Sequence, residues 1–336
     1  MTFVVMALVA VAPWQSLDGG ARAEQVQALK ALPVEARFLA ATEGFLGTPY
    51  VLSPLGEGEG HDPDPLLRYD AADCVTMVEE SMALALAPDD ARVLETLNHI
   101  RYEAEPSFDG RLHVMEAQWL PVNLARGLLE DVTREYGKAA TRRVSKRITE
   151  ATWQEKGGKG LGLSPAAQVK GEFFIDLVPS EQAPAVLSIA PAGLIVVVVR
   201  ADRPRLVSRI THVGVLVQKP SGPFLRHASR SFKKVVDEPV ERYLKRNLEF
   251  GAWTVEGVSL YRVRTPGWLD AGTPLVAEVD AGAPDLGLTV DAGAPVPVVV
   301  DTSVEPSRPA RGCGCSAFDG SAVLLAVLLL RRRVLA

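Results

Sequence analysis

The sequence predicts an α+β fold, with helices in the first half of the chain and strands in the second. Apolar residues recur at helical spacing from Val75 to Leu86, which is typical of an amphipathic helix. Ile195 to Val199 is a continuous apolar run of the kind that forms a buried strand, and further strand-like runs separated by turn residues follow it. Because helices precede strands, we expect an antiparallel sheet joined by hairpins.

The composition is that of an ordinary globular protein and excludes several classes. The chain has 336 residues and a formal net charge of −5, which argues against a general nucleic-acid binder. Its three cysteines, Cys74, Cys313 and Cys315, are too few for a disulfide scaffold. No cluster of Cys and His shows zinc-ligand spacing, so we expect neither a metal nor another cofactor.

The expected helices are placed by apolar periodicity and by their end signals. They span residues 26–46, residues 74–87 up to Pro88, a segment capped by Asp89 or Asp90 with Val93, Leu94, Leu97 and Ile100 on one face, and residues 123–136.

The expected strands follow from apolar and β-branched runs. They span residues 195–199, 211–217, 224–229, 235–236 and 254–263.

Cys74 stands at the start of the second expected helix. Asp73 before it is a good N-cap, because its carboxylate can accept the unpaired N–H groups of the first turn. Cys74 then occupies the first helical position, where the helix dipole stabilises a thiolate. The alternative interpretation is that Cys74 is simply a small buried apolar residue, as cysteines outside disulfides often are.

Two histidines provide a second half for a cysteine site. His212 begins one expected strand and His227 lies near the end of the next, across a short turn at Pro220 to Pro223. A hairpin brings such positions close together. One imidazole could then take the Cys74 proton while the other orients it, as in a catalytic triad. The alternative is that each histidine is a partly buried structural residue.

Four motifs in order resemble those of the NlpC-type cell-wall cysteine peptidases: Gly47-Thr48-Pro49-Tyr50, Asp73-Cys74, His212-Val213-Gly214-Val215 and His227-Ala228-Ser229. A closer resemblance is to a branch of N-acetylmuramoyl-L-alanine amidase-like proteins once of unknown function. That resemblance rests on Asp73-Cys74-Val75-Thr76 with Glu79, on Ile100-Arg101-Tyr102, and on Arg111 and His113 ahead of Trp119. It extends from about Phe45 to Val263.

The resemblance implies a papain-like fold, in which the helix bearing the nucleophile packs on an antiparallel sheet or half-barrel. It implies Cys74 as nucleophile, His212 as base and His227 as the residue that orients it. It also makes Tyr50, Arg111, His113 and Trp119 candidates for binding an acidic peptide or a sugar. For the last three, ordinary structural pairing and packing is the alternative.

The implied activity is hydrolysis of an amide bond in peptidoglycan or muropeptides, with N-acetylmuramoyl-L-alanine as the leading substrate. A γ-D-glutamyl peptidase acting on stem peptides remains open. So do an acyl transferase and a surface binding module of the same fold.

Both ends of the chain read as export and sorting segments. Residues 1–23 have an apolar run and the small residues Ala21 and Ala23, which are typical of a signal peptide cleaved before Glu24, although a buried helix is the alternative. The catalytic domain is expected over residues 24–264, followed by a Pro-rich linker with Asp-Ala-Gly repeats over residues 265–311. Residues 312–336 contain Cys313 and Cys315, a short apolar run and an arginine cluster, and they resemble myxobacterial C-terminal sorting signals. This predicts an exported protein held at the cell surface or in the outer membrane or periplasm. Its expected partners are a sorting protease and the membrane. The alternative is that the C-terminal segment is a plain membrane anchor.

The apolar run of the C-terminal segment is shorter than the ~20 residues of a typical membrane span, so we expect it to be a transient signal. The mature protein should therefore lack Arg331 to Arg333 and end near Cys313 or Cys315. Mass spectrometry of the protein from its native cells tests this. An intact C-terminal peptide with unmodified cysteines in the membrane fraction would support the plain anchor instead.

Overall fold

The structure is a computed structural model that describes residues 11–249 and 253–267. The predicted C-terminal segment 312–336 and nearly all of the predicted linker lie outside these residues.

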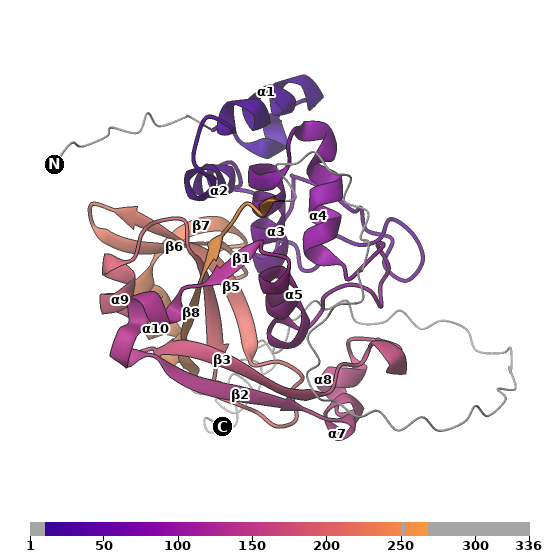
Figure 1. The fold of residues 1–336 in the computed structure, drawn as a ribbon, viewed down its shortest axis with the longest axis vertical. Helices are drawn as coiled ribbons and strands as arrows, with labels where there is room; N and C mark the ends of the chain where they lie inside the picture. The colour runs from indigo at the N-terminus through magenta and orange to yellow at the C-terminus, as the bar shows by residue number, and fades with distance from the viewer. Residues whose placement is uncertain (1–10, 250–252, 268–336) are drawn as a thin grey trace, which may run out of the picture.

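The described helices and strands alternate irregularly along the chain (Figure 1). The α-helices are α1 (Gly19–Leu29), α2 (Val34–Glu43), α3 (Cys74–Leu86), α4 (Val93–Arg101), α5 (Leu120–Ala125), α6 (Thr133–Gly137), α7 (Glu150–Gln154), α8 (Lys156–Lys159), α9 (Ala183–Ile189) and α10 (Val240–Glu249). The strands are β1 (Leu129–Asp131), β2 (Arg142–Ile148), β3 (Gly171–Pro179), β4 (Ile195–Arg200), β5 (Ile210–Lys219), β6 (Gly222–Ser229), β7 (Lys234–Pro239) and β8 (Val255–Val263).

The strands form one antiparallel sheet in the order β2-β3-β8-β4-β5-β6-β7, with β1 added to β8. The prediction of a mixed α+β fold with an antiparallel sheet is therefore confirmed. The β5–β6 hairpin pairs Val215 with Arg226 and Leu216 with Leu225. It positions the candidate site, because His212 lies on β5 and His227 on β6.

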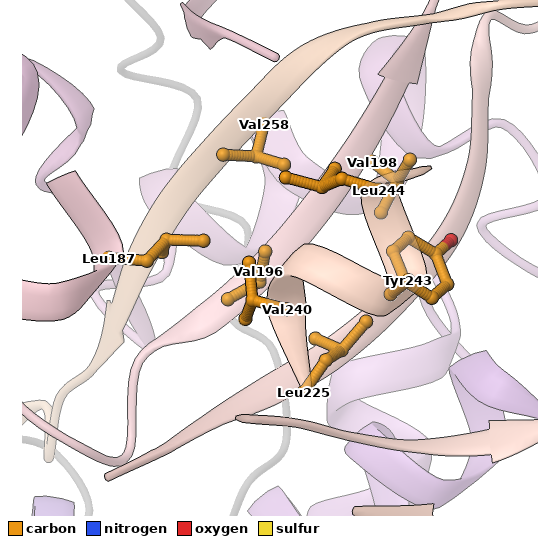
Figure 2. Close-up of a pocket in the computed structure, with 8 residues that line it drawn as sticks. All are labelled: Leu187, Val196, Val198, Leu225, Val240, Tyr243, Leu244 and Val258. Atoms are coloured by element: carbon orange, nitrogen blue, oxygen red, sulfur yellow. The ribbon is translucent and has the colours of Figure 1, made fainter. Parts of the chain in front are cut away.

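The two faces of the sheet carry separate hydrophobic cores. Side chains alternate along a strand, so Val213 and Val215 of β5 face one core and Leu216 faces the other. The first core contains the apolar residues of α2 and α3. The second contains those of α9 and α10, and Figure 2 shows Leu187, Val240 and Leu244 from these helices meeting the sheet. The sheet thus separates α3 from α10.

The predicted extents of two helices are wrong. The expected helix over residues 26–46 is two helices, because the chain turns before α2, whose N-cap is Pro33. The expected helix over residues 123–136 is α5, β1 and α6 instead. Gly127 there has φ = +71°, a left-handed conformation that ends α5, and the next residues pair with β8.

The folded domain extends upstream of its predicted start at residue 24. Trp14 is 1% exposed and lies in the first core, and its indole N–H donates to the Ala41 carbonyl at 2.7 Å. Helix α1 begins at Gly19, and Arg22 in it pairs with Asp90. Cleavage before Glu24 would therefore divide α1 and remove Trp14 from the core.

We expect Trp14→Ala to lower the free energy of unfolding by about 3–5 kcal/mol, because it leaves a cavity in the core. Chemical denaturation of the two proteins measures this. Gly44→Ala is the matched probe, since a Cβ there would lie 2.4 Å from the Trp14 Nε1. That substitution should destabilise the wild type and cost less in the Trp14→Ala background. Equal stability of Trp14→Ala and wild type would show that residues before Glu24 are dispensable.

Candidate active site

The start of α3 is fixed by the Asp73 side chain. Its Oδ1 accepts the backbone N–H groups of Val75 and Thr76, and its Oδ2 accepts that of Ser53. The Thr76 hydroxyl accepts the Asp73 N–H in return, which completes a capping box. The predicted N-cap is therefore present, and it also joins α3 to the loop that follows Tyr50.

Cys74 is the first residue of α3 and is 1% exposed. Tyr50 lies close by, because its backbone bridges to Ala72. Burial, followed by the charge of Asp73, raises the pKa of Tyr50 to about 12, so its hydroxyl keeps its proton and can donate a hydrogen bond.

His212 on β5 and His227 on β6 are in direct contact, as the hairpin required. His212 Nε2 and His227 Nδ1 lie 2.7 Å apart. The Tyr243 ring of α10 stacks on His212 at 5.6 Å and meets His227 edge-on at 5.4 Å. Tyr243 therefore restricts how far either imidazole can rotate.

Glu238 on β7 extends this pair into a chain. Its Oε2 lies 3.3 Å from His227 Nε2 and accepts a hydrogen bond from Arg246 at 2.7 Å. Burial alone would raise the pKa of Glu238, but its contacts with His227 and Arg246 lower it below its ordinary value. The carboxylate is thus the acceptor that begins the chain.

The carboxylate determines which ring nitrogens carry protons. The 3.3 Å contact with Glu238 does not have the geometry of a hydrogen bond in this structure. A carboxylate only accepts, so a hydrogen bond formed there would come from His227 Nε2 and leave its Nδ1 as an acceptor. His212 Nε2 must then donate to that atom, which leaves the lone pair of His212 on Nδ1. Burial, then His227, and then the guanidiniums of Arg200 and Arg246, lower the pKa of His212 well below its ordinary value. His212 is therefore a neutral base.

The histidine pair and α3 lie on opposite faces of β5. His212 contacts Tyr243, on the α10 side, whereas Val213 belongs to the core that contains α3. They share one end of the sheet, because Pro49 and Tyr50 pair with Lys234 and Lys233 at the start of β7, and the backbone of Tyr50 bridges to Ala72, two residues before Cys74. The structure brings His212 and His227 together but does not hydrogen-bond either of them to Cys74.

Two of the predicted substrate-binding residues are buried in ion-pair networks. Arg111 donates to Glu57 at 2.6 Å and to Asp62 at 3.0 Å. Trp119 is 1% exposed and its indole N–H donates to Glu79. Both side chains already have the contacts of structural residues.

Glu79 is the centre of the second network, one turn after Cys74. Arg101 donates to it at 2.6 Å, and both side chains are buried. Burial raises the pKa of Glu79, and the charge of Arg101 and the Trp119 N–H oppose that rise.

His113 differs from the other candidates. It is buried, and its Nε2 lies 2.6 Å from the Phe108 carbonyl oxygen. Burial lowers its pKa to about 4, so the ring is neutral at pH 7. His113 lines a small pocket beside Val75, and its Nδ1 has no hydrogen-bond partner among the described residues.

Sequence reasoning missed Glu238 and Tyr243. Glu238 lies in a strand predicted only at residues 235–236, and Tyr243 in a helix that was not predicted. The available signal was the spacing of Val236 and Glu238, because residues two apart on a strand face the same side. A third strand after His227 would therefore carry the Glu238 carboxylate on one face.

Comparisons with known proteins identify the family of this chain. Residues 40–251, more than half of the chain, match the family described as N-acetylmuramoyl-L-alanine amidase-like, or AmiA-like. The chain belongs to this N-acetylmuramoyl-L-alanine amidase-like family. No curated protein matches it.

Similar solved structures share the fold. A Legionella pneumophila protein of the family DUF1460 is 23% identical, with a TM-score of 0.63, covering 73% of this chain and 93% of its own. An N-acetylmuramoyl-L-alanine amidase from Bacteroides uniformis is 25% identical, with a TM-score of 0.56, covering 69% and 99%. A putative xylanase from Bacteroides fragilis is 25% identical, with a TM-score of 0.54, covering 67% and 100%.

We expect Arg101→Met to lower the free energy of unfolding by about 3–5 kcal/mol, because it leaves the Glu79 carboxylate buried and unpaired. Arg92→Met is the control: Arg92 pairs with Glu95 at a more exposed site, so its loss should destabilise the protein far less. Adding Glu79→Gln to Arg101→Met should recover part of the loss. Similar costs for the two arginine variants would contradict the importance of this buried pair.

Proposed function

We propose that this protein is a cysteine-dependent hydrolase of the NlpC type, with a papain-like arrangement, that cleaves the amide bond between N-acetylmuramic acid and L-alanine in peptidoglycan or its fragments. The family match supports the substrate class. The chain from Glu238 through His227 to His212 is the observation that supports the mechanism, because it leaves a lone pair on one defined nitrogen of a neutral imidazole.

The reaction follows from these groups. His212 Nδ1 takes the Cys74 thiol proton, and the thiolate attacks the amide carbonyl carbon. The backbone N–H of Cys74 and the Tyr50 hydroxyl are the proposed donors to the oxyanion. The imidazolium gives its proton to the departing amine as the C–N bond breaks, leaving a thioester. His212 then deprotonates a water molecule, which attacks the thioester and releases the acid and the Cys74 thiol.

The mechanism requires a rearrangement from the described structure. Proton transfer needs Cys74 Sγ within hydrogen-bonding reach of His212 Nδ1. Since α3 and the histidine pair lie on opposite faces of β5, either the His212 side chain or the first turn of α3 must shift around the shared end of the sheet.

We also propose export, with the protein held at the cell surface through its C-terminal segment after a sorting protease has acted near Cys313 and Cys315. This proposal rests on the sequence pattern alone, because that segment lies outside the described residues. Among residues 11–249 and 253–267, no helix has the length and apolarity needed to cross a membrane.

The catalytic assignment predicts a graded set of losses. With reduced protein and a muropeptide substrate, Cys74→Ser should abolish hydrolysis. His212→Ala should lower kcat by about 10²–10⁴-fold, the range of general acid–base catalysis, and His227→Ala by less, because it only orients the base. Mass spectrometry of the digest should show a new L-alanine amino terminus. Cleavage after D-glutamate would instead indicate the γ-D-glutamyl peptidase, and wild-type rates in Cys74→Ser would refute the mechanism.

The lowered pKa of His212 sets the acid limit of activity. Only the unprotonated ring can accept the thiol proton, and the ring stays unprotonated until the pH falls below its lowered pKa. The acid limb of kcat/KM should therefore lie below the ordinary histidine pKa of about 6.5. A pH–rate profile of wild type measures it, and an acid limb above that value would contradict the assignment.

A further inference from the structure

Arg200, at the end of β4, links the strand of His212 to the helix of Tyr243. Its Nε donates to the Thr211 hydroxyl at 2.8 Å, and Thr211 directly precedes His212. Its Nη2 donates to the side-chain oxygen of Asn247 at 2.9 Å. Asn247 lies one turn after Tyr243 on α10, and its amide donates to the Tyr243 carbonyl oxygen at 2.8 Å. One guanidinium therefore connects the two elements whose rings stack at His212.

The positive charge of Arg200 is held by neutral acceptors. Besides the hydroxyl and the amide oxygen, the Trp253 carbonyl oxygen accepts from Nη1. In the described part of the chain no carboxylate forms an ion pair with Arg200, whereas the buried guanidinium of Arg226 faces Asp237 at 2.8 Å. Burial lowers the pKa of Arg200, because a desolvated charge without an opposite charge is costly. The fold therefore keeps this cation in place at a cost in free energy.

His212 is the titratable group that this charge reaches. The groups that face its ring are His227 from β6, Arg200 from β4, and Tyr243 and Arg246 from α10. Tyr243 keeps its proton, because burial raises the pKa of its hydroxyl. Arg246 is paired with Glu238 of β7 at 2.7 Å, so its charge is largely compensated. The charge of Arg200 has no such compensation, and it disfavours a second positive charge on His212.

We propose that Arg200 is a positioning residue for the proposed base: it holds the Tyr243 ring against His212 and places beside the imidazole a positive charge that no described carboxylate neutralises, so that the ring stays neutral and able to accept a proton. The inference rests on the proposed function for its consequence in catalysis. Its physical content is the protonation of His212, which can be measured without any substrate.

A nuclear magnetic resonance titration of the full chain tests the proposal. The chain has only five histidines, and the Cε1–H signal that disappears in His212→Gln is that of His212. Arg200→Met removes the charge and should raise the pH at which His212 becomes protonated by about one unit, the lower end of the range for a nearby charge. Arg200→Lys keeps a charge but not the planar fork, so it should stay closer to wild type in this pH.

Arg203→Met is the matched control for the loss of a positive charge. The Arg203 guanidinium lies over the same Trp253 ring as that of Arg200, at 5.3 Å against 5.7 Å from the ring centre. It is not among the groups that shift the pKa of His212. Arg203→Met should therefore leave the titration of His212 unchanged. Circular dichroism of each variant is compared with that of wild type, so that a change of fold is not mistaken for a change of charge.

Three results would overturn the proposal. The first is the same protonation of His212 in wild type and in a folded Arg200→Met protein. The second is an equal shift in Arg203→Met. The third is that His212 stays unprotonated in both wild type and Arg200→Met down to the pH of acid unfolding.

Hydrolysis of a muropeptide separates this inference from the proposed function. The acid limb of kcat/KM should move to higher pH in Arg200→Met by the same amount as the titration, and the plateau should fall in both Arg200 variants, because the fork that links β5 to α10 is lost. A shifted titration without hydrolysis by wild type would leave the role of Arg200 standing and refute the amidase. Hydrolysis with the same pH profile in Arg200→Met would leave the amidase standing and refute the role of Arg200.

Discussion

The Asp73 carboxylate is the interaction on which the rest of the site depends. It accepts backbone N–H groups from Val75 and Thr76 of α3 and from Ser53 of the preceding loop. Every residue of α3 is buried, so the surrounding core and the capped first turn together hold the helix in place in the described structure. Asp73 thereby sets the position of Cys74, of Val75 beside the His113 pocket, and of Glu79 one turn further on.

The β5–β6 hairpin is the second constraint. Its register places His212 and His227 on the same face, and β7 adds Glu238 to that face. The chemistry is therefore divided between two rigid units, a capped helix on one side of the sheet and a hydrogen-bonded imidazole chain on the other. Both units adjoin one end of the sheet, where Pro49 and Tyr50 pair with the start of β7 and Tyr50 bridges to Ala72.

Much of this could be predicted from local sequence. The N-cap at Asp73 and the hairpin that pairs the histidines depend on neighbours in sequence, and both are present. Features set by distant contacts were missed. Trp119 looked like a sugar-binding residue, but Glu79, 40 positions away, accepts its N–H and holds it in the core. Trp14, in the predicted leader, makes another such contact, because its indole N–H donates to Ala41 on α2. Cleavage of the leader stays a prediction. Glu238 and Tyr243 belong to a strand and a helix whose positions are set by packing on the β5–β6 hairpin.

The central claim is that the histidine chain serves the Cys74 thiol, and the pH dependence of alkylation at Cys74 tests it most directly. The rate of iodoacetamide modification would be followed on the Cys74 peptide by mass spectrometry, in reduced wild type and in His212→Ala. The account predicts that the wild-type rate titrates well below the ordinary thiol pKa of about 8.5, and that His212→Ala moves it back toward that value. Identical profiles in the two proteins would show that His212 does not act on Cys74.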